Sequence, residues 1–120
     1  MTMHHARLSQ AAEQPWRNGG GTTRVLLTWP DELHWRLRVS VATISADGPF
    51  SPFPGVERWF AVIEGAGVRL ALPEGTAVLQ PGDAPRRFDG EAAPGCTLLD
   101  GATQDLNLMA RRDAGHAGMA

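Results

Sequence analysis

The stretch WRNGGGTTR, residues 16–24, combines a flexible backbone with polar side chains and is the first candidate for a ligand site. Three consecutive glycines lose much conformational entropy when they become ordered, and they can adopt positive φ angles or admit a close neighbour. Flanked by Asn18 and Arg24, their N–H groups would form a cradle for a small anion. A β-bulge or a tight strand crossing would require the same glycines, so the sequence leaves both interpretations open. The three glycines are Gly19, Gly20 and Gly21.

A second candidate is the segment 35–44, in which polar and apolar residues alternate. A strand repeats every two residues, so Arg36, Arg38 and Ser40 fall on one face. In an open antiparallel sheet this face would meet water, whereas in a closed barrel it would line a cavity. Two guanidinium groups in such a cavity would bind a carboxylate, because the planar fork of arginine matches the carboxylate oxygens.

All 11 cationic residues are arginines, and the chain contains no lysine and no tyrosine. Schiff-base chemistry on lysine and general acid catalysis by tyrosine are thereby excluded. Zinc and iron sites need about three convergent ligands, usually with histidine, and the histidines here are scattered. The single cysteine, Cys96, is interpreted as a buried and inert thiol. We therefore expect no metal and no other cofactor. The histidines are His4, His5, His34 and His116.

Three polar residues in apolar surroundings complete the candidates. Glu64 ends an apolar segment and would join a binding site if it lay buried near the arginines, which would lower its pKa. Asp105 and Asn107 alternate with leucines and share one face of the last apolar segment. For each of the three, a solvent-facing position is the simpler interpretation.

Short strands are expected to position these residues. The chain has 120 residues, the size of one domain, with 14 glycines and 9 prolines spread between short apolar runs. This pattern is typical of an all-β sandwich or barrel. The prolines within residues 46–55 predict an ordered loop. The predicted strands are residues 24–29, 35–44, 59–64, 68–72, 76–79, 85–88, 97–99 and 106–109.

Charge and hydropathy limit the partners and the location of the protein. The formal net charge is −2, which argues against a nucleic-acid or anionic-membrane partner. No apolar run approaches the ~20 residues of a membrane-spanning helix. The start MTMHHARLSQ lacks the apolar core of a signal peptide, so the expected location is the cytoplasm.

Three segments together resemble the HutD/Ves family of bacterial proteins, which is associated with histidine utilisation. They are WRNGGGTTR, residues 35–70 with the sequence DGPFSPFPG inside, and DLNLMARR at residues 105–112. The resemblance implies a cupin-like β-barrel or jelly-roll sandwich of antiparallel strands. WFAVIEGAGVRL is similar to a cupin hairpin, and LQPGDAPRRF is similar to the later Pro-Gly-Asp turn of cupins. The histidines that bind metal in ordinary cupins are replaced here, within residues 53–57 and 85–88.

The resemblance also implies a single cupin-like domain over residues 1–120. The residues themselves predict an N-terminal extension over 1–15, with a helical turn at 5–13 that Pro15 ends, and a mobile tail in the Gly/Ala-rich residues 113–120. Family members are longer and carry a second cupin-like half, so this chain corresponds to the N-terminal part.

The implied function is binding of a small carboxylate from histidine breakdown, such as formylglutamate or urocanate, with a regulatory role in that pathway. The match to the family's motifs implies that the main ligand-binding residues are Asn18, Arg24 and Arg36. Two alternatives stay open: a metal-independent cupin enzyme, an isomerase or a hydrolase, and a non-catalytic interaction module. Arginines beside Glu64 would leave it a weak base, which favours binding over catalysis.

We predict a homodimer. Without a second half, strand edges and apolar surface would stay open, and an identical chain would cover them by a two-fold contact. Alternatively, charged residues such as Arg58 would protect the strand edges from pairing, and the protein would stay a monomer. Sedimentation equilibrium is expected to give a mass above the 12.9 kDa of one chain. A mass that stays at this value as the concentration rises contradicts the prediction. The apolar surface is expected to include Val68, Leu70, Leu72, Val78 and Leu79.

Overall fold

Ten antiparallel strands form two sheets in residues 13–112, the part of the chain that this computed structural model describes. The larger sheet has the order β1 (Glu13–Pro15), β2 (Gly21–Trp29), β3 (Leu37–Ile44), β10 (Thr103–Arg111), β5 (Val56–Glu64) and β8 (Arg86–Asp89). The smaller sheet has the order β4 (Gly48–Pro49), β9 (Gly95–Leu98), β6 (Val68–Leu72) and β7 (Gly75–Leu79). A short 3₁₀ helix, Gly90–Ala92, joins β8 to β9.

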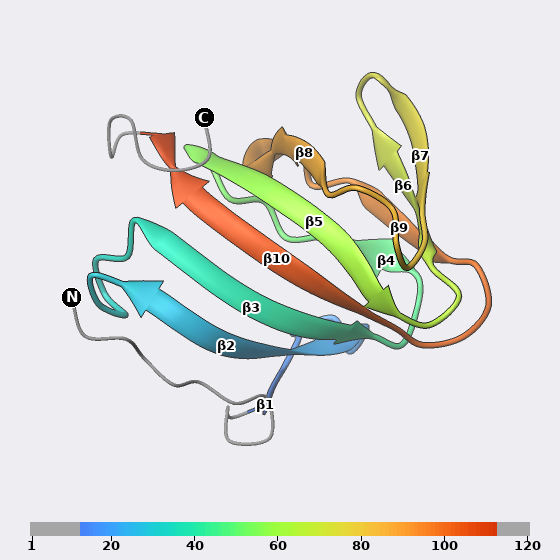
Figure 1. The fold of residues 1–120 in the computed structure, drawn as a ribbon, viewed down its shortest axis with the longest axis horizontal. Helices are drawn as coiled ribbons and strands as arrows, with labels where there is room; N and C mark the ends of the chain where they lie inside the picture. The colour runs from blue at the N-terminus through green and yellow to red at the C-terminus, as the bar shows by residue number, and fades with distance from the viewer. Residues whose placement is uncertain (1–12, 113–120) are drawn as a thin grey trace.

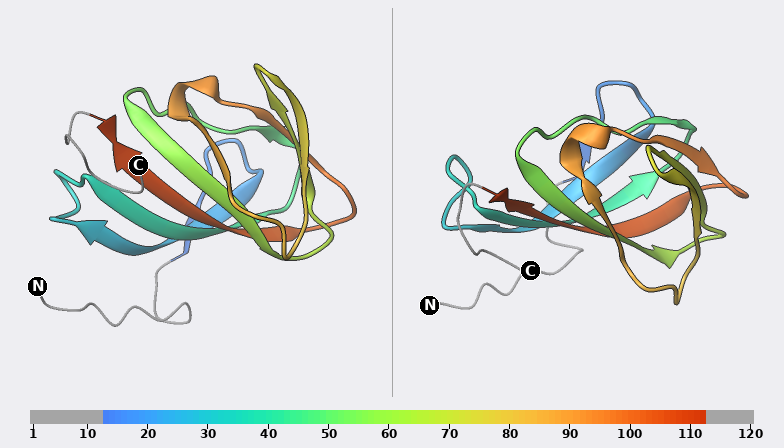
Figure 2. Two further views of the ribbon diagram at one scale, coloured as in Figure 1. Left: turned by 45° about the horizontal axis from the view of Figure 1, so that its top comes forward. Right: turned by 90° about the horizontal axis from the view of Figure 1, so that it is seen from above.

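The larger sheet curves across the molecule, and the smaller sheet lies beside the end at which β3 and β5 finish (Figure 1). Two further views show the same arrangement, with β6, β7 and β9 closing over that end (Figure 2). The expected all-β architecture of antiparallel strands is confirmed.

Alternating apolar residues explain the strands that the sequence predicted. Residues 68–72 form β6, in which every second residue is buried while Arg69 and Ala71 are exposed. Several boundaries differ from the prediction; for example, β2 begins at Gly21 instead of Arg24, and β10 spans Thr103–Arg111 instead of residues 106–109. β5 begins at Val56 instead of Trp59. The predicted loop contains β4, whose Pro49 lies in an edge strand, where a missing N–H is tolerated.

The N-terminal helical turn was predicted as far as Glu13, but Glu13–Pro15 is strand β1, paired with residues 22–24 of β2. Residues 1–12 and 113–120 lie outside the described residues, and with them the rest of that turn and the predicted tail. Among the described residues no helix is long and apolar enough to cross a membrane.

The main apolar core lies between the two sheets. Phe60 and Val62 of β5 and Ile44 of β3 pack there against the inward side chains of the smaller sheet. Most of the apolar surface that we expected to be open is part of this core. Val68, Leu70, Leu72 and Leu79 are buried, and only Val78 of that set is exposed. The burial of Val68, Leu70 and Leu72 follows from the alternation of β6, whose apolar face meets the larger sheet, and Leu79 of β7 is paired with Val68.

The triple-glycine loop is a tight turn between β1 and β2. Gly19 has a φ of +75°, and its N–H donates to the carbonyl of Trp16 over 3.1 Å. The N–H of Gly20 donates to Oδ1 of Asn18 over 2.8 Å. Because the amides of both glycines are used within the loop, the predicted anion cradle is corrected to a turn.

Of the three loop glycines, Gly21 is the one whose replacement is most restricted by its surroundings. A Cβ atom at this position would overlap the carbonyl oxygen of Thr43 on β3 and lie 3.2 Å from the Trp16 ring. At Gly20 the nearest atom, Oδ1 of Asn18, would be 3.1 Å away and belongs to a side chain that can shift.

Gly21→Ala is therefore expected to destabilise the fold by about 1–3 kcal/mol, the usual cost of overpacking. Gly20→Ala serves as the matched control and should cost clearly less. Urea denaturation of both variants measures the difference. Equal midpoints for Gly21→Ala and the parent would contradict the close approach of β2 and β3.

Candidate ligand-binding site

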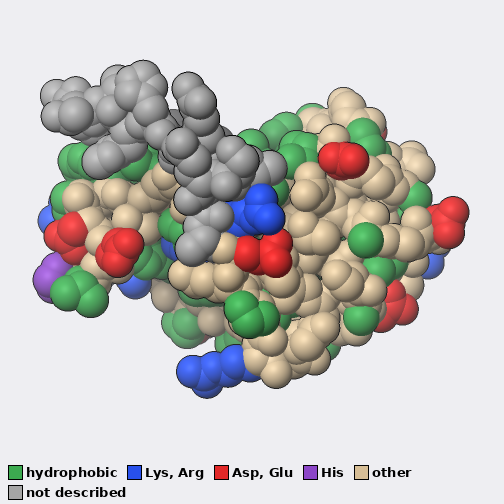
Figure 3. Space-filling model, turned by 90° about the horizontal axis from the view of Figure 1, so that it is seen from below, with side chains coloured by type: hydrophobic (Ala, Val, Ile, Leu, Met, Phe, Trp, Pro, Cys, Tyr) green, Lys and Arg blue, Asp and Glu red, His purple; other side chains and the backbone are tan. Residues whose placement is uncertain are grey.

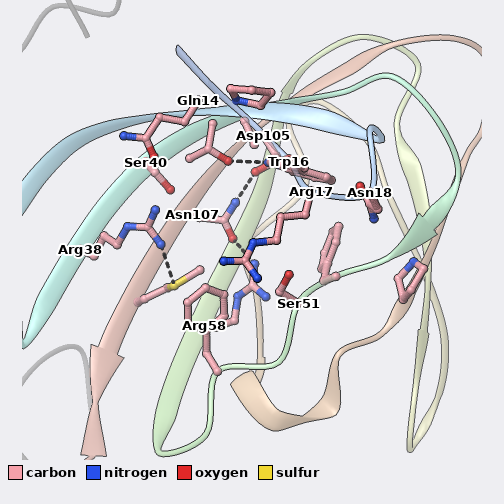
Figure 4. A pocket seen from close by; sticks show the side chains of 17 residues that line it. Gln14, Trp16, Arg17, Asn18, Arg38, Ser40, Ser51, Arg58, Asp105 and Asn107 are labelled. Atoms are coloured by element: carbon pink, nitrogen blue, oxygen red, sulfur yellow. Dashed lines mark hydrogen bonds between the residues drawn. The ribbon is translucent and has the colours of Figure 1, made fainter. Parts of the chain in front are cut away.

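A cavity of about 360 Å³ opens beside the core, between β3, β10 and β5 and the loops that precede β2 and β5. Its charged lining residues in the described chain are Arg17, Arg38, Arg58 and Asp105. In Figure 4, Asn107 lies between Asp105 and Arg58 at the centre of this cavity. The other lining residues include Trp16, Asn18, Thr23, Ser40, Phe50, Ser51, Phe53, Asn107 and Met109.

Strand register places the polar side chains in rows across the three central strands. Met109 of β10 is level with Arg38 of β3 and Arg58 of β5, so the two arginines flank it. One row further along, Asn107 is level with Ser40 and with the core residue Phe60. The inner face of the sheet thus changes from apolar to polar along the strands, and the cavity lies at the polar end.

Arg58 is buried, with 4% of its surface exposed. Its guanidinium carbon lies 5.2 Å from the ring centroids of Phe50 and Phe88 and 5.5 Å from that of Phe53. Such distances allow cation–π attraction. The segment DGPFSPFPG therefore has a structural role, because two of these three rings come from it. Burial lowers the pKa of Arg58 to about 10, so the guanidinium remains charged at neutral pH.

A chain of hydrogen bonds links Arg58 to Asp105. Nη2 of Arg58 donates to Oδ1 of Asn107 over 2.9 Å, and Nδ2 of Asn107 donates to Oδ1 of Asp105. Burial raises the pKa of Asp105 to about 8, and the nearby charge of Arg58 opposes this rise. The carboxyl group is therefore mostly neutral at pH 7.

Three polar atoms in this cluster are buried without a hydrogen-bond partner among the described residues. They are Nε and Nη1 of Arg58 and Oδ2 of Asp105. Buried polar atoms are nearly always paired in native proteins, so atoms of this kind mark where a ligand or solvent binds.

A register shift precedes Asp105. Gln104 is paired with Glu64 of β5, but Asp105 is paired with Val62, so Ile63 is the additional residue of a bulge. Bulges often re-aim side chains near functional sites. Here the extra residue belongs to β5, where Ile63 and Glu64 are both exposed, whereas β10 keeps its alternation and points Thr103, Asp105 and Asn107 inward.

The cavity does not fit the metal that ordinary cupins hold. Among its described lining residues there is one carboxylate and no histidine or cysteine, and the three arginines would repel a cation. The described chain also contains no group of three metal-ligating side chains. His34 is exposed and pairs with Asp31 over 3.3 Å, and Figure 3 shows a histidine at the periphery. His4, His5 and His116 lie outside the described residues.

Cys96 is buried in the core, as the sequence predicted. Burial raises the pKa of its thiol to about 12, which keeps it protonated and unreactive.

The structure brings together only part of the predicted site. Asn18, Arg38 and Ser40 line the cavity. Gly19, Gly20 and Gly21 form the turn that carries Asn18.

The other three predicted residues lie elsewhere. Arg24 is part of β2 and pairs with Glu13 over 3.0 Å, outside the cavity lining. Arg36 is exposed and precedes β3, whose inward residues begin only at Arg38. Glu64 is exposed at the end of β5 and does not line the cavity with the arginines. Their placement corrects the expectation that the three flank one ligand.

Arg58 is the central residue that sequence analysis assigned to the wrong surface, as an edge charge. A signal was present, because Val56, Arg58, Phe60 and Val62 alternate, which places Arg58 on the inner face. Starting the strand at Trp59 hid this periodicity. Asp105 and Asn107 were recognised as sharing a face, but the sequence did not show that this face is buried.

A family model described as HutD matches residues 8–120. The chain belongs to the HutD family. Protein Ves from Citrobacter koseri is 39% identical over 102 residues, which cover 82% of this chain and 52% of that protein. An uncharacterised 21.2 kDa protein of the hutC 3′ region in Pseudomonas putida is 38% identical over 108 residues, covering 86% of this chain and 55% of the relative. The chain thus spans about half the length of these relatives.

Solved structures agree with the fold. HutD from Pseudomonas fluorescens SBW25, in a formate condition, matches with a TM-score of 0.82 and 34% identity, covering 88% of this chain and 59% of that one. A cupin domain of a transcriptional regulator from Enterobacter cloacae matches with a TM-score of 0.62 at 16% identity, covering 76% of this chain and 96% of that one. This second likeness concerns the fold alone, and the expected cupin-like fold is confirmed.

The raised pKa of Asp105 makes stability depend on pH. The native state retains a proton that the unfolded carboxyl, with an ordinary value of 3.8, has already released. The contribution of Asp105 to the free energy of unfolding is fully present below about pH 4. It is lost as the pH rises towards 8, by up to about 1.4 kcal/mol per pH unit.

Urea unfolding at about pH 5.5 and about pH 8 is expected to show this loss in the parent and a much smaller one in Asp105→Asn. Asp100→Asn, at an exposed position, is the control and should behave like the parent. Identical pH slopes for Asp105→Asn and the parent would show that Asp105 is ionised in the native state.

Proposed function

We propose that this protein binds a small carboxylate metabolite in its barrel cavity and acts without catalysis, as a regulatory component of histidine utilisation. The observation that carries the proposal is the arginine pair. Arg38 and Arg58 flank the same residue of β10 inside one cavity. The only carboxyl group among the described lining residues is kept mostly neutral by burial.

Charge balance supports an anionic ligand. Removing a cation from water costs several kcal/mol unless it is paired, and the proximity of Arg38 further lowers the pKa of Arg58. Nε and Nη1 of Arg58 have no partner among the described residues. A carboxylate is the group best suited to these atoms, because each of its ionised oxygens accepts a charge-assisted hydrogen bond from a guanidinium N–H and its charge balances that of Arg58.

Cavity size supports a small metabolite. The volume of about 360 Å³ lies at the lower end of the range of small-molecule sites, roughly 300–1,000 Å³. Arg17, exposed at the rim, adds a third cation and would accommodate a second carboxylate. Formylglutamate and urocanate satisfy these limits. The family membership and the relative from the hutC region connect the proposal to histidine breakdown.

One observation favours a metal-independent enzyme as the second candidate. Asp105 has a pKa of about 8, and general acid–base catalysis needs a value near the working pH. No histidine, cysteine, lysine or tyrosine lines the described cavity to act with it. Proton NMR of formylglutamate or urocanate after incubation with the protein separates the two candidates, because only an enzyme would produce new signals.

Binding is expected to raise the melting temperature. N-formyl-L-glutamate or urocanate at a hundredfold excess over its Kd should stabilise the native state by about 2.7 kcal/mol. Arg38→Ala should abolish the shift. Arg58→Lys should weaken it strongly, since a point charge cannot replace the guanidinium fork. Differential scanning fluorimetry measures all three proteins.

Arg36→Ala is the matched control, because it removes an arginine two residues away that is exposed and outside the cavity. It should bind like the parent. Retention of the full shift in Arg38→Ala, with loss of it in Arg36→Ala, would place the site on the outer surface and overturn the proposal.

A further inference from the structure

The two ends of the cavity differ in chemistry, and the anion-binding arginines account for only one of them. The other end is formed by Asp105, of which 1% is exposed. Its Oδ2 atom is buried and has no hydrogen-bond partner among the described residues. A buried, unpartnered oxygen of this kind imposes a requirement on whatever occupies the cavity.

We infer that Asp105 determines specificity by donating a hydrogen bond from Oδ2 to a neutral carbonyl oxygen of the ligand, so that the cavity selects carboxylates that also carry an acyl group. This inference rests on the proposed function, since it concerns the same cavity. It adds the second recognition element and thereby the ligand class: acylated amino acids and related acids rather than free amino acids or simple dicarboxylates.

The hydrogen-bond chain fixes which oxygen donates. Arg58 has only donors, so Asn107 must turn its Oδ1 towards Arg58 and its Nδ2 towards Asp105. Oδ1 of Asp105 is thereby an acceptor, and a proton on the carboxyl group resides on Oδ2. A protonated Oδ2 needs an acceptor, which a carbonyl oxygen supplies and an ammonium group does not.

The surroundings of Asp105 keep it in the form that donates. The ionisable groups around it are Arg58 from β5, Arg38 from β3, Arg17 from the loop before β2 and Cys96 from β9. The charge of Arg58 favours ionisation, but burial outweighs it and raises the pKa of Asp105 to about 8. A ligand carboxylate on the arginines would neutralise their charge and so favour the protonated form further.

The spacing suits a short ligand. Nη2 of Arg58 reaches the level of Asn107, where it donates over 2.9 Å. Asp105 and Asn107 both belong to β10 and are two residues apart, and two residues of a strand span roughly 7 Å. A short acylated amino acid extends over this distance, with its carboxylate at the arginines and its carbonyl oxygen at Asp105.

Isothermal titration calorimetry with three matched compounds tests the inference. N-formyl-L-glutamate carries the carbonyl acceptor, L-glutamate carries an ammonium group at the same carbon, and glutarate carries neither. At about pH 6.5 the parent is expected to bind N-formyl-L-glutamate at least roughly tenfold more tightly than the other two, the value of one buried hydrogen bond. At about pH 9 this preference should shrink severalfold, because Asp105 becomes ionised.

Two variants separate the hydrogen bond from the structural role of Asp105. Asp105→Asn keeps a donor that does not titrate, so it should keep the preference at both pH values. Asp105→Leu removes the donor and should lose the preference at both. A preference that survives in Asp105→Leu, or one that Asp105→Asn fails to retain at the higher pH, overturns the inference. If Asp105→Leu does not fold, the inference is tested by comparing how the preference for N-formyl-L-glutamate changes with pH in the parent and in Asp105→Asn.

The outcomes also distinguish this inference from the proposed function. Equal affinity for the three compounds means that the carboxylate site exists but that Asp105 does not form a hydrogen bond with the acyl group. No binding of any of them at millimolar concentration overturns the carboxylate site itself, and with it this inference.

Discussion

Burial of the Arg58 guanidinium group inside the barrel is the constraint on which the rest of the site depends. A charge at this depth costs several kcal/mol unless neighbours compensate for lost water. The chain supplies three aromatic rings and one amide oxygen: Phe50, Phe53 and Phe88 surround the group, and Asn107 accepts from it. It supplies no ionised carboxylate, because Asp105 is itself held largely neutral. The cavity therefore has a net positive charge that an anionic ligand would balance.

This constraint also explains why the described cavity does not fit the metal typical of such folds. A metal centre concentrates positive charge at one ion held by histidines. In this cavity the positive charge belongs to the side chains, and the fold needs only to fix two guanidinium groups on the two strands that flank β10. The register of β3, β10 and β5 does so by placing Arg38 and Arg58 level with Met109. A cation would be repelled by the same arrangement.

Much of the fold followed from the sequence, because the apolar alternation of segments such as 68–72 has one physical interpretation. The site followed less well. Alternation places Arg36, Arg38 and Ser40 on one face, but it does not show where the strand begins, and only the last two enter the cavity. The inner position of Arg58 was hidden by a strand boundary set three residues late. Whether the face that carries Asp105 is exposed to solvent or buried depends on how the barrel closes, and this depends on contacts between segments far apart in the sequence.

The central claim is that the two guanidinium groups receive a carboxylate from a ligand. NMR of the arginine Nε–Hε groups tests this most directly, with signals assigned through single arginine-to-lysine variants. N-formyl-L-glutamate is expected to shift the signals of Arg38 and Arg58 in a saturable manner and to leave that of Arg36 unchanged. Unchanged signals of Arg38 and Arg58 at millimolar ligand, or a shift confined to Arg36, would contradict it.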